Sequence, residues 1–340
     1  MADNSEIRRR ALELIAEDGR DVAKRLAEEF GFSRQTANAH LKALLRDEVI
    51  KAEGHTRARV YSLENTYNIN RAYIRKDLQE DRVWSELVAP VVGDLPDNVR
   101  DIWRYGVTEM VNNAIDHSGS VSVYVFVVRN ALYTSCWVID NGEGIFHKIA
   151  AELGLYDQRE AILELAKGKL TTDPERHTGE GIFFASRMFD LFYIYSGKLS
   201  YSHHIDHEFD YLEENYRDGR GTTIFMRLFN DSKRIPREVF DRFAMPDEFT
   251  FAKTVVPVRL AQYEGEKLVS RSQAKRLYQR FEKFRYVTLD FEGVTEIGQA
   301  FADELFRVFT NEHPTVELAA TNTTDLVAKM IARAQAKGSI

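Results

Sequence analysis

Apolar residues recur along this chain at two different spacings, and each spacing predicts one kind of element. Near the N-terminus they follow the interval of one helix face, and the expected helices span residues 6–16, 21–30 and 34–46. Residues 51–63 instead alternate between apolar and polar side chains around a glycine, which is typical of a two-stranded wing. Before the third helix, Gly31 and Phe32 form an expected tight turn, with Ser33 as the N-cap.

The middle of the chain combines a helix that has one polar face with two glycine-bearing loops. The pattern predicts helices at 109–117 and 182–191 and strands at 132–139 and 224–228. The loop 140–144 (DNGEG) follows the strand 132–139, and the loop 178–181 (TGEG) runs into the helix 182–191. Both loops therefore join regular elements, and the second opens a helix, whose N-terminal N–H groups favour phosphate.

After residues 231–236 the composition changes, and we expect a domain boundary there. Strand and helix patterns then alternate to the end of the chain. The expected strands are 255–260, 286–291 and 316–321, and the expected helices are 270–284, 299–310 and 325–336. This alternation predicts a small sheet covered by helices.

Composition narrows the class of protein. A chain of 340 residues with 44% hydrophobic content can form two or three domains with their own cores. No apolar run reaches the length of a membrane span, and the N-terminus lacks the apolar core of a signal peptide. Cys136 is the only cysteine, which excludes an internal disulfide and a zinc site of several cysteines. We therefore expect a soluble cytoplasmic protein with no membrane association.

The polar face of the helix at 109–117 offers chemistry for a metal and a water molecule. Glu109 and Asn113 are four residues apart and share that face, with Asp116 and His117 a turn further on. A carboxylate can accept a proton from water, and an amide oxygen is a ligand that Mg²⁺ accepts. At the end of the strand 132–139, Asp140 can accept a hydrogen bond from the amino group of a base.

These segments resemble, in order and spacing, the N, G1 and G2 boxes of the GHKL ATPases, the family of gyrase, histidine kinases and MutL. The run 221–223, which enters the strand 224–228, resembles the last box of that family. The resemblance implies a Bergerat α/β sandwich that binds ATP and Mg²⁺ over about half of the chain. A helix with a capped polar face and two ordinary turns is the alternative interpretation.

The resemblance also implies a role for each matching residue. Glu109 would be the general base, Asn113 the Mg²⁺ ligand and Asp140 the reader of the adenine amino group. The remaining residues of the expected nucleotide site are Asp116, His117, Gly142, Gly144, Thr178, Gly179, Gly181 and Thr223. The family's lid would occupy the polar stretch that holds Lys167, Lys169 and Arg176, where a cation could meet the γ-phosphate. No one of these three cations is singled out, because a solvated loop is the favoured interpretation for each.

The first 63 residues resemble a bacterial winged helix-turn-helix, and the run 31–44 (GFSRQTANAHLKAL) carries the resemblance. Residues 33–62 hold six Lys/Arg against three Asp/Glu, a local +3 in a chain of net charge −7, which favours DNA as the partner. The expected contacts to base edges and the DNA backbone come from Arg34, Gln35, Asn38 and Lys42 on the third helix and from Arg57 and Arg59, beside His55, on the wing. The alternative is a winged helix used for protein contacts or dimerisation.

Residues 64–100 are expected to form a linker helix region between the wing and the nucleotide domain. This segment contains no histidine, whereas a histidine kinase of the GHKL type needs a phospho-acceptor histidine here. Autophosphorylation on histidine is therefore disfavoured. In the polar insertion 202–216, His203, His204, His207 and Asp206 could bind a transition metal, although a hairpin tip or solvated loop is the favoured interpretation.

The run 290–298 (DFEGVTEIG) resembles the central motif of STAS domains, the anti-sigma-antagonist fold, and 268–274 and 299–306 resemble a STAS-like branch of unassigned function. Antagonist domains carry a phosphorylated serine or threonine after this strand, where this chain has Gln299 and Ala300. The usual phosphorylation switch is therefore in doubt, and Thr295, Ser270 and Ser272 are the remaining candidate acceptors. A protein partner of this domain is expected by the same resemblance.

Together these features predict an α+β multidomain protein. Its expected domains are a winged helix-turn-helix (1–63), the linker region (64–100), a Bergerat-type ATPase domain (101–232) and a small STAS-like α/β domain (233–340). The leading hypothesis is a homodimeric transcriptional regulator in which ATP and Mg²⁺, with slow hydrolysis, switch the domain arrangement. The alternatives are an anti-sigma-type serine/threonine kinase and a non-hydrolysing ATP sensor or scaffold.

Overall fold

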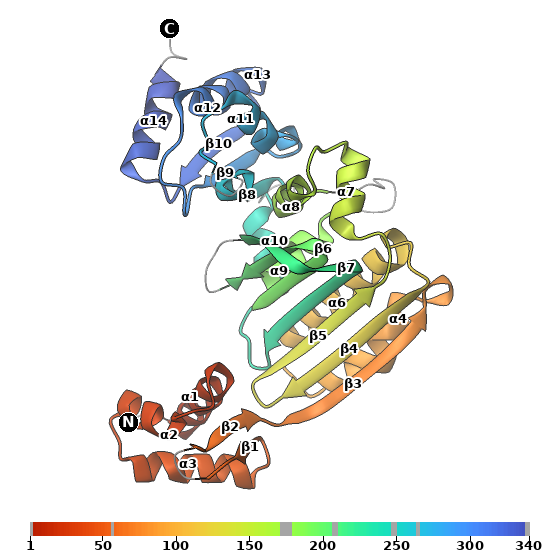
Figure 1. Cartoon of the computed structure of the whole chain (residues 1–340), viewed down its shortest axis with the longest axis vertical. Coiled ribbons are helices and arrows are strands. Elements are labelled where there is room, and N and C mark those ends of the chain that lie inside the picture. The colour runs from red at the N-terminus through yellow and green to blue at the C-terminus, as the bar shows by residue number, and fades with distance from the viewer. Residues whose placement is uncertain are drawn as a thin grey trace.

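The structure is a computed structural model that describes residues 3–55, 58–170, 179–205, 210–245, 250–262 and 266–336, without the side chains of 215–218. Three modules follow one another along the chain (Figure 1). The winged N-terminal module lies at one end and the helix-covered C-terminal module at the other, with a five-stranded sheet between them.

The N-terminal module is a three-helix unit with a two-stranded wing, as predicted. Its elements are α1 (Asn4–Glu17), α2 (Val22–Phe30), α3 (Arg34–Arg46), β1 (Ile50–Glu53) and β2 (Val60–Leu63). Ser33 caps α3, because its side chain accepts a hydrogen bond from the backbone N–H of Thr36 at 3.1 Å. The apolar faces of the helices form a separate small core, which Leu132 from the turn after β4 joins.

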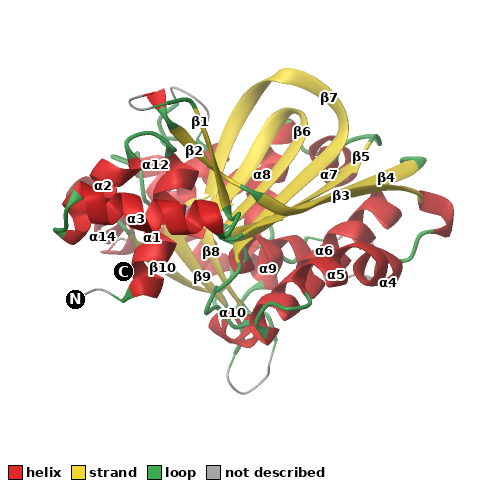
Figure 2. Cartoon of the chain, turned by 90° about the horizontal axis from the view of Figure 1, so that it is seen from below, coloured by secondary structure: helices red, strands yellow, loops and turns green. Residues whose placement is uncertain are grey.

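The middle module is an antiparallel sheet in the order β3-β4-β5-β7-β6. Its strands are β3 (Asn65–Ile74), β4 (Ser122–Asn130), β5 (Tyr133–Asp140), β6 (Leu191–His204) and β7 (Asp210–Phe229). Its helices are α4 (Glu80–Val83), α5 (Ala89–Val92), α6 (Asp97–His117), α7 (Ile145–Leu153), α8 (Gln158–Lys167) and α9 (Gly181–Met188). Helices α4, α5, α6 and α9 gather on one face of the sheet (Figure 2).

Helix α6 packs on the inner face of this sheet because the two elements present matching apolar surfaces. On β4, every second residue from Val123 to Val127 points inward and is fully buried, as strand alternation requires. On α6, Trp103 is fully buried and meets the ring of Phe189 with their centroids 4.8 Å apart. A Cβ at Gly106 would lie 2.4 Å from a ring carbon of Phe189, so only glycine allows this close approach.

The expected linker 64–100 is not a helical linker throughout. Residues 65–74 form β3, which pairs with β4 along nearly its whole length and is an edge strand of the middle sheet. Only Glu64 separates β3 from β2 of the wing. The prediction missed this strand although Tyr67, Ile69 and Tyr73 follow the two-residue interval of a strand, because Arg71 interrupts the pattern.

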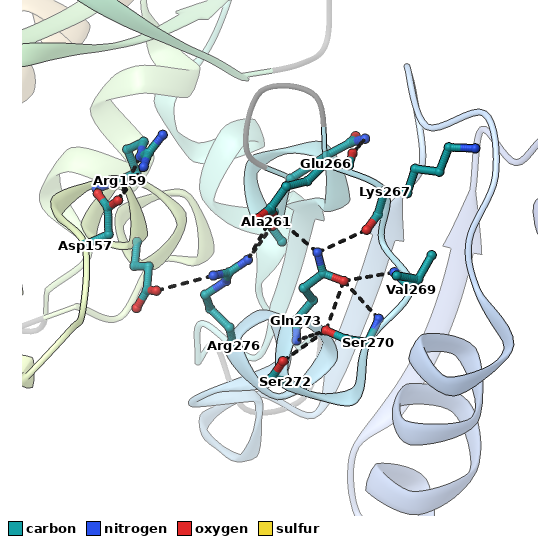
Figure 3. A network of polar contacts seen from close by, with 12 residues as sticks. Asp157, Arg159, Ala261, Glu266, Lys267, Val269, Ser270, Ser272, Gln273 and Arg276 are labelled. Carbon is teal, nitrogen blue, oxygen red and sulfur yellow. Dashed lines mark hydrogen bonds and ion pairs between the residues drawn. The ribbon is translucent and has the colours of Figure 1, made fainter.

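The C-terminal module is a three-stranded parallel sheet in the order β10-β9-β8, with helices between the strands. Its elements, after α10 (Pro236–Phe243), are β8 (Lys253–Pro257), α11 (Arg271–Tyr278), β9 (Tyr286–Asp290), α12 (Gln299–Asp303), a π-helical turn (Glu304–Phe309), α13 (Thr310–Glu312), β10 (Glu317–Thr321) and α14 (Asp325–Ala336). The helix expected at 270–284 ends at Tyr278, because Arg280 adopts a left-handed conformation with φ 68°. Ser270 and Gln273 form a capping box at its start (Figure 3).

The expected boundary at 231–236 does not separate two cores. Helix α10 follows it in the sequence but packs back on the middle module, where the ring of Phe240 lies 4.6 Å from Phe184 and 5.4 Å from Tyr105. Phe251, which precedes β8, contacts the rings of both Phe183 and Phe184. One hydrophobic core therefore runs from the middle sheet into the C-terminal module.

Removal of one aromatic ring from this junction is expected to destabilise the protein strongly, because it leaves a cavity in the core. Phe183 is 1% exposed and contacts the rings of Phe184, Phe243 and Phe251. We expect Phe183→Ala to lower the free energy of unfolding by about 3–5 kcal/mol, as for other buried phenylalanines. Urea unfolding followed by circular dichroism measures this loss. A loss below about 1 kcal/mol would show that the junction does not hold the modules together.

Candidate functional site

A cavity of about 360 Å³ lies over the polar face of α6, between the loop after β5, α7 and the start of α9. Four segments that are distant in the sequence build its wall. The lining residues that carry polar groups or glycine are Glu109, Asn112, Asn113, His117, Ser118, Asp140, Gly144, Lys148, Gly179, Gly181 and Thr222. Most of the expected site residues thus meet in one place.

Helix α6 delivers the acidic and amide groups. Glu109 and Asn113 lie one turn apart and both line the cavity, while Val107 and Val111 on the other face are fully buried in the core. His117, one turn further on, also lines the cavity. Asp116 is exposed and does not line the cavity, so the structure does not bring it together with the other expected site residues.

Asp140 sits at the end of β5 and is 5% exposed. Its Oδ1 accepts hydrogen bonds from the backbone N–H of Gly142 at 2.8 Å and of Thr222 at 3.3 Å. Burial raises the pKa of the carboxyl above its ordinary value, and these hydrogen bonds partly oppose that rise. The two backbone donors fix the side chain, so the carboxyl is held rigidly in the cavity wall.

The second glycine loop closes the cavity beside Glu109. A Cβ at Gly181 would lie 2.1 Å from Oε2 of Glu109, so the carboxylate rests directly against the backbone at the start of α9. The carbonyl of Gly179 accepts a hydrogen bond from the N–H of Leu170 at 3.0 Å, which joins the two ends of the intervening segment. Thr178 lies outside the described residues.

Two other expected members of the site lie elsewhere. Thr222, and not Thr223, faces the cavity, because side chains on β7 alternate and Thr222 shares its face with Ile224. The Oγ1 of Thr222 also accepts a hydrogen bond from the N–H of Ile145 at 3.0 Å. Gly142 contributes its N–H to Asp140 but does not line the cavity.

In the described part of the polar stretch, neither Lys167 nor Lys169 lines the cavity. Lys167 is fully buried at the end of α8, where its Nζ donates to Oε1 of Glu164 at 2.5 Å. Lys169 donates to the carbonyl of Lys283 at 2.9 Å, and Arg176 lies outside the described residues. Among the described residues that line the cavity, the lysine is Lys148. Its Nζ donates to the carbonyl of His117 at 3.0 Å.

Sequence reasoning missed Lys148, Asn112 and the apolar side of the cavity. That side is lined by Val138, Ile145, Ile149, Leu165, Leu170, Ile182 and Ile224. A usable signal existed on α7, where Ile145, Lys148 and Ile149 share one helix face. Leu165 and Leu170 had no such signal, since their place depends on how α8 packs. The cavity therefore joins an apolar wall to a wall of acidic, amide and backbone groups.

The DNA-facing candidates on α3 share an exposed surface. Arg34, Gln35, Asn38 and Lys42 are all exposed, whereas Ala37, Leu41 and Leu44 on the other face are buried. The side chain of Asn38 donates to the carbonyl of Arg34 at 2.9 Å. On the wing, Arg59 is exposed and lies over the ring of Tyr61, and Arg57 is outside the described residues.

The histidines of the expected insertion do not gather around a metal position. His203 is buried, and its Nδ1 lies 2.7 Å from Oδ1 of Asp210, while His204 pairs with the hydroxyl of Tyr193 at 2.7 Å. Asp206 and His207 lie outside the described residues. In the described part of the chain, no three His, Cys, Asp or Glu side chains are arranged to hold a metal ion.

Comparison with known families places two of the three modules. Residues 4–51 match the model of a winged helix-turn-helix DNA-binding family, and residues 273–328 match the STAS-like domain of unknown function (DUF4325). No curated protein matches the chain. The chain thus carries an N-terminal winged helix-turn-helix and a C-terminal STAS-like module, and the first supports a DNA-binding regulator. None of the described helices is long and apolar enough to cross a membrane.

The buried carboxyl of Asp140 predicts a pH-dependent difference between the wild type and an isosteric variant. Its pKa in the folded chain is raised above 3.8, so it stabilises the fold at low pH and loses that contribution as the pH rises through the folded-state pKa. Asp140→Asn keeps an oxygen acceptor but cannot ionise. We therefore expect the stability of the variant relative to the wild type to increase from about pH 4 to pH 7.

Urea unfolding of both proteins across this pH range measures the difference. Asp101→Asn is the control, because Asp101 is an exposed aspartate on α6. A difference that stays flat or shrinks as the pH rises would contradict the burial of a charged Asp140.

Proposed function

We propose that this protein is a DNA-binding regulator whose middle module binds ATP with Mg²⁺ and changes the domain arrangement in response. The observation that carries the proposal is the convergence of Glu109, Asn113 and Asp140 with the backbone at Gly179 and Gly181 on one cavity. At about 360 Å³ the cavity falls within the range of small-molecule sites.

One set of groups around the cavity would contact the adenine of ATP, and another set would contact its phosphates. Asp140 would accept a hydrogen bond from the adenine amino group, with the apolar side chains of Ile145 and Ile149 against the ring. The N-terminus of α9, which begins at Gly181, would receive the phosphates. Asn113 would bind the Mg²⁺ that accompanies them, and Glu109 would orient and deprotonate the attacking water.

Substitution of the base-reading carboxyl tests nucleotide binding. Asp140→Asn removes a charged acceptor from a buried position, and a hydrogen bond to a charged group contributes about 1.5–3 kcal/mol. We expect the affinity for Mg²⁺-ATP to fall roughly 10- to 150-fold in isothermal titration calorimetry. Asp101→Ala, on the exposed surface of α6, should bind as the wild type does. Equal affinity of Asp140→Asn and wild type would remove the assignment of Asp140.

Substitution of Glu109 distinguishes nucleotide binding from nucleotide hydrolysis. Glu109→Ala should retain ATP affinity within about threefold but lose roughly 10²- to 10⁴-fold in turnover, since positioned general bases contribute on that order. Release of inorganic phosphate under single-turnover conditions measures the rate. Unchanged turnover at constant affinity would show that Glu109 is not the base.

The recognition surface of α3 predicts a salt-dependent interaction with duplex DNA. Arg34→Ala combined with Lys42→Ala removes two exposed cations from α3 and should abolish binding in fluorescence anisotropy. Lys329→Ala combined with Arg333→Ala is the matched control, because it removes the same charge from the exposed face of α14. Retained, salt-sensitive binding by the α3 variant would refute this surface.

A further inference from the structure

Helix α8 has two sides with different neighbours, and this makes it a physical link between two modules. On one side Leu165, together with Leu170 just beyond the helix, lines the candidate nucleotide cavity. On the other side α8 packs against β8 of the STAS-like module, and it lies between the two modules in Figure 1. A movement of α8 therefore changes the cavity wall and the inter-module contact together.

Buried charges hold this contact. Glu164 on α8 is 1% exposed, and its two carboxylate oxygens have different partners. Oε1 accepts from Nζ of Lys167 at 2.5 Å, and Oε2 accepts from Nη1 of Arg280 at 2.8 Å. Lys167 also donates to the carbonyl of Gln279 at 2.9 Å. Arg280 and Gln279 belong to the STAS-like module, so the ionic network crosses between the modules.

The same arginine reaches the segment that leads toward the second glycine loop. The Nη2 of Arg280 donates to the carbonyl of Lys169 and lies 3.5 Å from that of Gly168. The next residue, Leu170, lines the cavity and is hydrogen-bonded to Gly179. From Arg280 to the backbone beside Glu109, the connection thus runs through only a few directly bonded residues.

Further contacts make the junction extensive and polar. Thr254 of β8 donates to the carbonyl of Lys167 at 2.7 Å, and Lys169 donates to the carbonyl of Lys283. Arg276 points from α11 toward the segment that carries Asp157 and Arg159 (Figure 3). Separating the modules would remove the partners that Glu164 and Lys167 have in the STAS-like module and so would change the contacts of α8. Docking and the local shape of α8 therefore form one cooperative unit.

We propose that the STAS-like module is an internal regulator of the nucleotide cavity, which it controls by holding α8 and residues 168–170 through Arg280. The proposal rests on the ATP site proposed above. When the module is docked, Leu165, Leu170 and Gly179 are held in the cavity wall and nucleotide binds tightly. When the contacts of Arg280 with Glu164 and with the carbonyl of Lys169 are broken, the wall loosens and nucleotide affinity falls. By linkage, bound nucleotide strengthens docking by the same factor.

Arg280 is a positioning residue in this scheme, because it acts on the cavity only through α8 and the segment after it. Its replacement by alanine leaves every side chain that lines the cavity chemically unchanged. Any effect on nucleotide affinity must therefore come from the loss of the held geometry. Arg280→Lys retains a positive charge for Glu164 but cannot make the forked contacts to both Glu164 and the backbone carbonyls.

The test measures the affinity of the full-length chain for a non-hydrolysable β,γ-imido analogue of ATP with Mg²⁺. We expect Arg280→Ala to weaken binding roughly 5- to 150-fold, the usual range of coupling between sites. Arg280→Lys should give an intermediate value. Arg307→Ala is the matched control, since Arg307 lies in the same module but pairs with Asp303 four residues before it. It should bind as the wild type does.

Hydrogen–deuterium exchange supplies a readout that does not depend on affinity alone. In the wild type, the analogue should slow amide exchange in α8 and in residues 278–284. In Arg280→Ala, both segments should exchange faster than in the wild type even without nucleotide. A merely structural role for Arg280 would destabilise the module without moving α8, and it would leave affinity unchanged after correction for the folded fraction.

The outcomes separate the two proposals. If the wild type does not bind the analogue, the ATP function fails and the proposed regulation fails with it. If the wild type binds and Arg280→Ala binds equally well, the regulation alone is overturned. If Arg280→Ala does not fold, Glu164→Gln, which weakens the same link from the α8 side, replaces it and must show the same loss of affinity.

Discussion

The burial of one face of α6 against the sheet is the constraint on which the candidate site depends. Trp103, Val107 and Val111 fix the rotation of the helix, because each is fully buried against the sheet side. Once that rotation is fixed, Glu109 and Asn113 can point in only one direction. Helix α9 packs against α6, where Phe189 at its end lies close to Gly106 and Gly181 at its start rests on the Glu109 carboxylate. Packing thus determines the chemistry that faces the cavity.

The sequence was most informative where a residue's place depends on local geometry. The bounds of α3 and α14, the Ser33 cap and the shared face of Glu109 and Asn113 follow from helix periodicity, which short-range interactions enforce. The family models independently support the winged module and the STAS-like module. The assignment of the middle module to an ATPase family remains a prediction from its motifs.

The sequence was least informative where tertiary contacts determine the environment of a residue. Nothing local distinguishes Thr222 from Thr223, and the register of β7 against β5 determines which one faces inward. Lys167 begins a polar stretch that is typical of a loop, yet it is fully buried. Its Nζ donates to the carboxylate of Glu164 in the middle module and to the carbonyl of Gln279 in the STAS-like module. Half of the residues of strand β3 are apolar, yet most of its side chains are exposed at the edge of the sheet, so pairing with β4 and not burial defines it.

The short connection between the wing and the sheet has a mechanical consequence. Strand β2 ends at Leu63 and β3 begins at Asn65, so the backbone passes from one sheet to the other without a flexible tether. Leu132 adds a second attachment by entering the core of the winged module. Arg9 of α1 adds a further attachment, because it pairs with Asp231 and lies over the ring of Phe229 at the end of β7. A change in sheet twist would therefore turn the winged module as a rigid body, and the displacement of α3 would grow with its distance from the sheet.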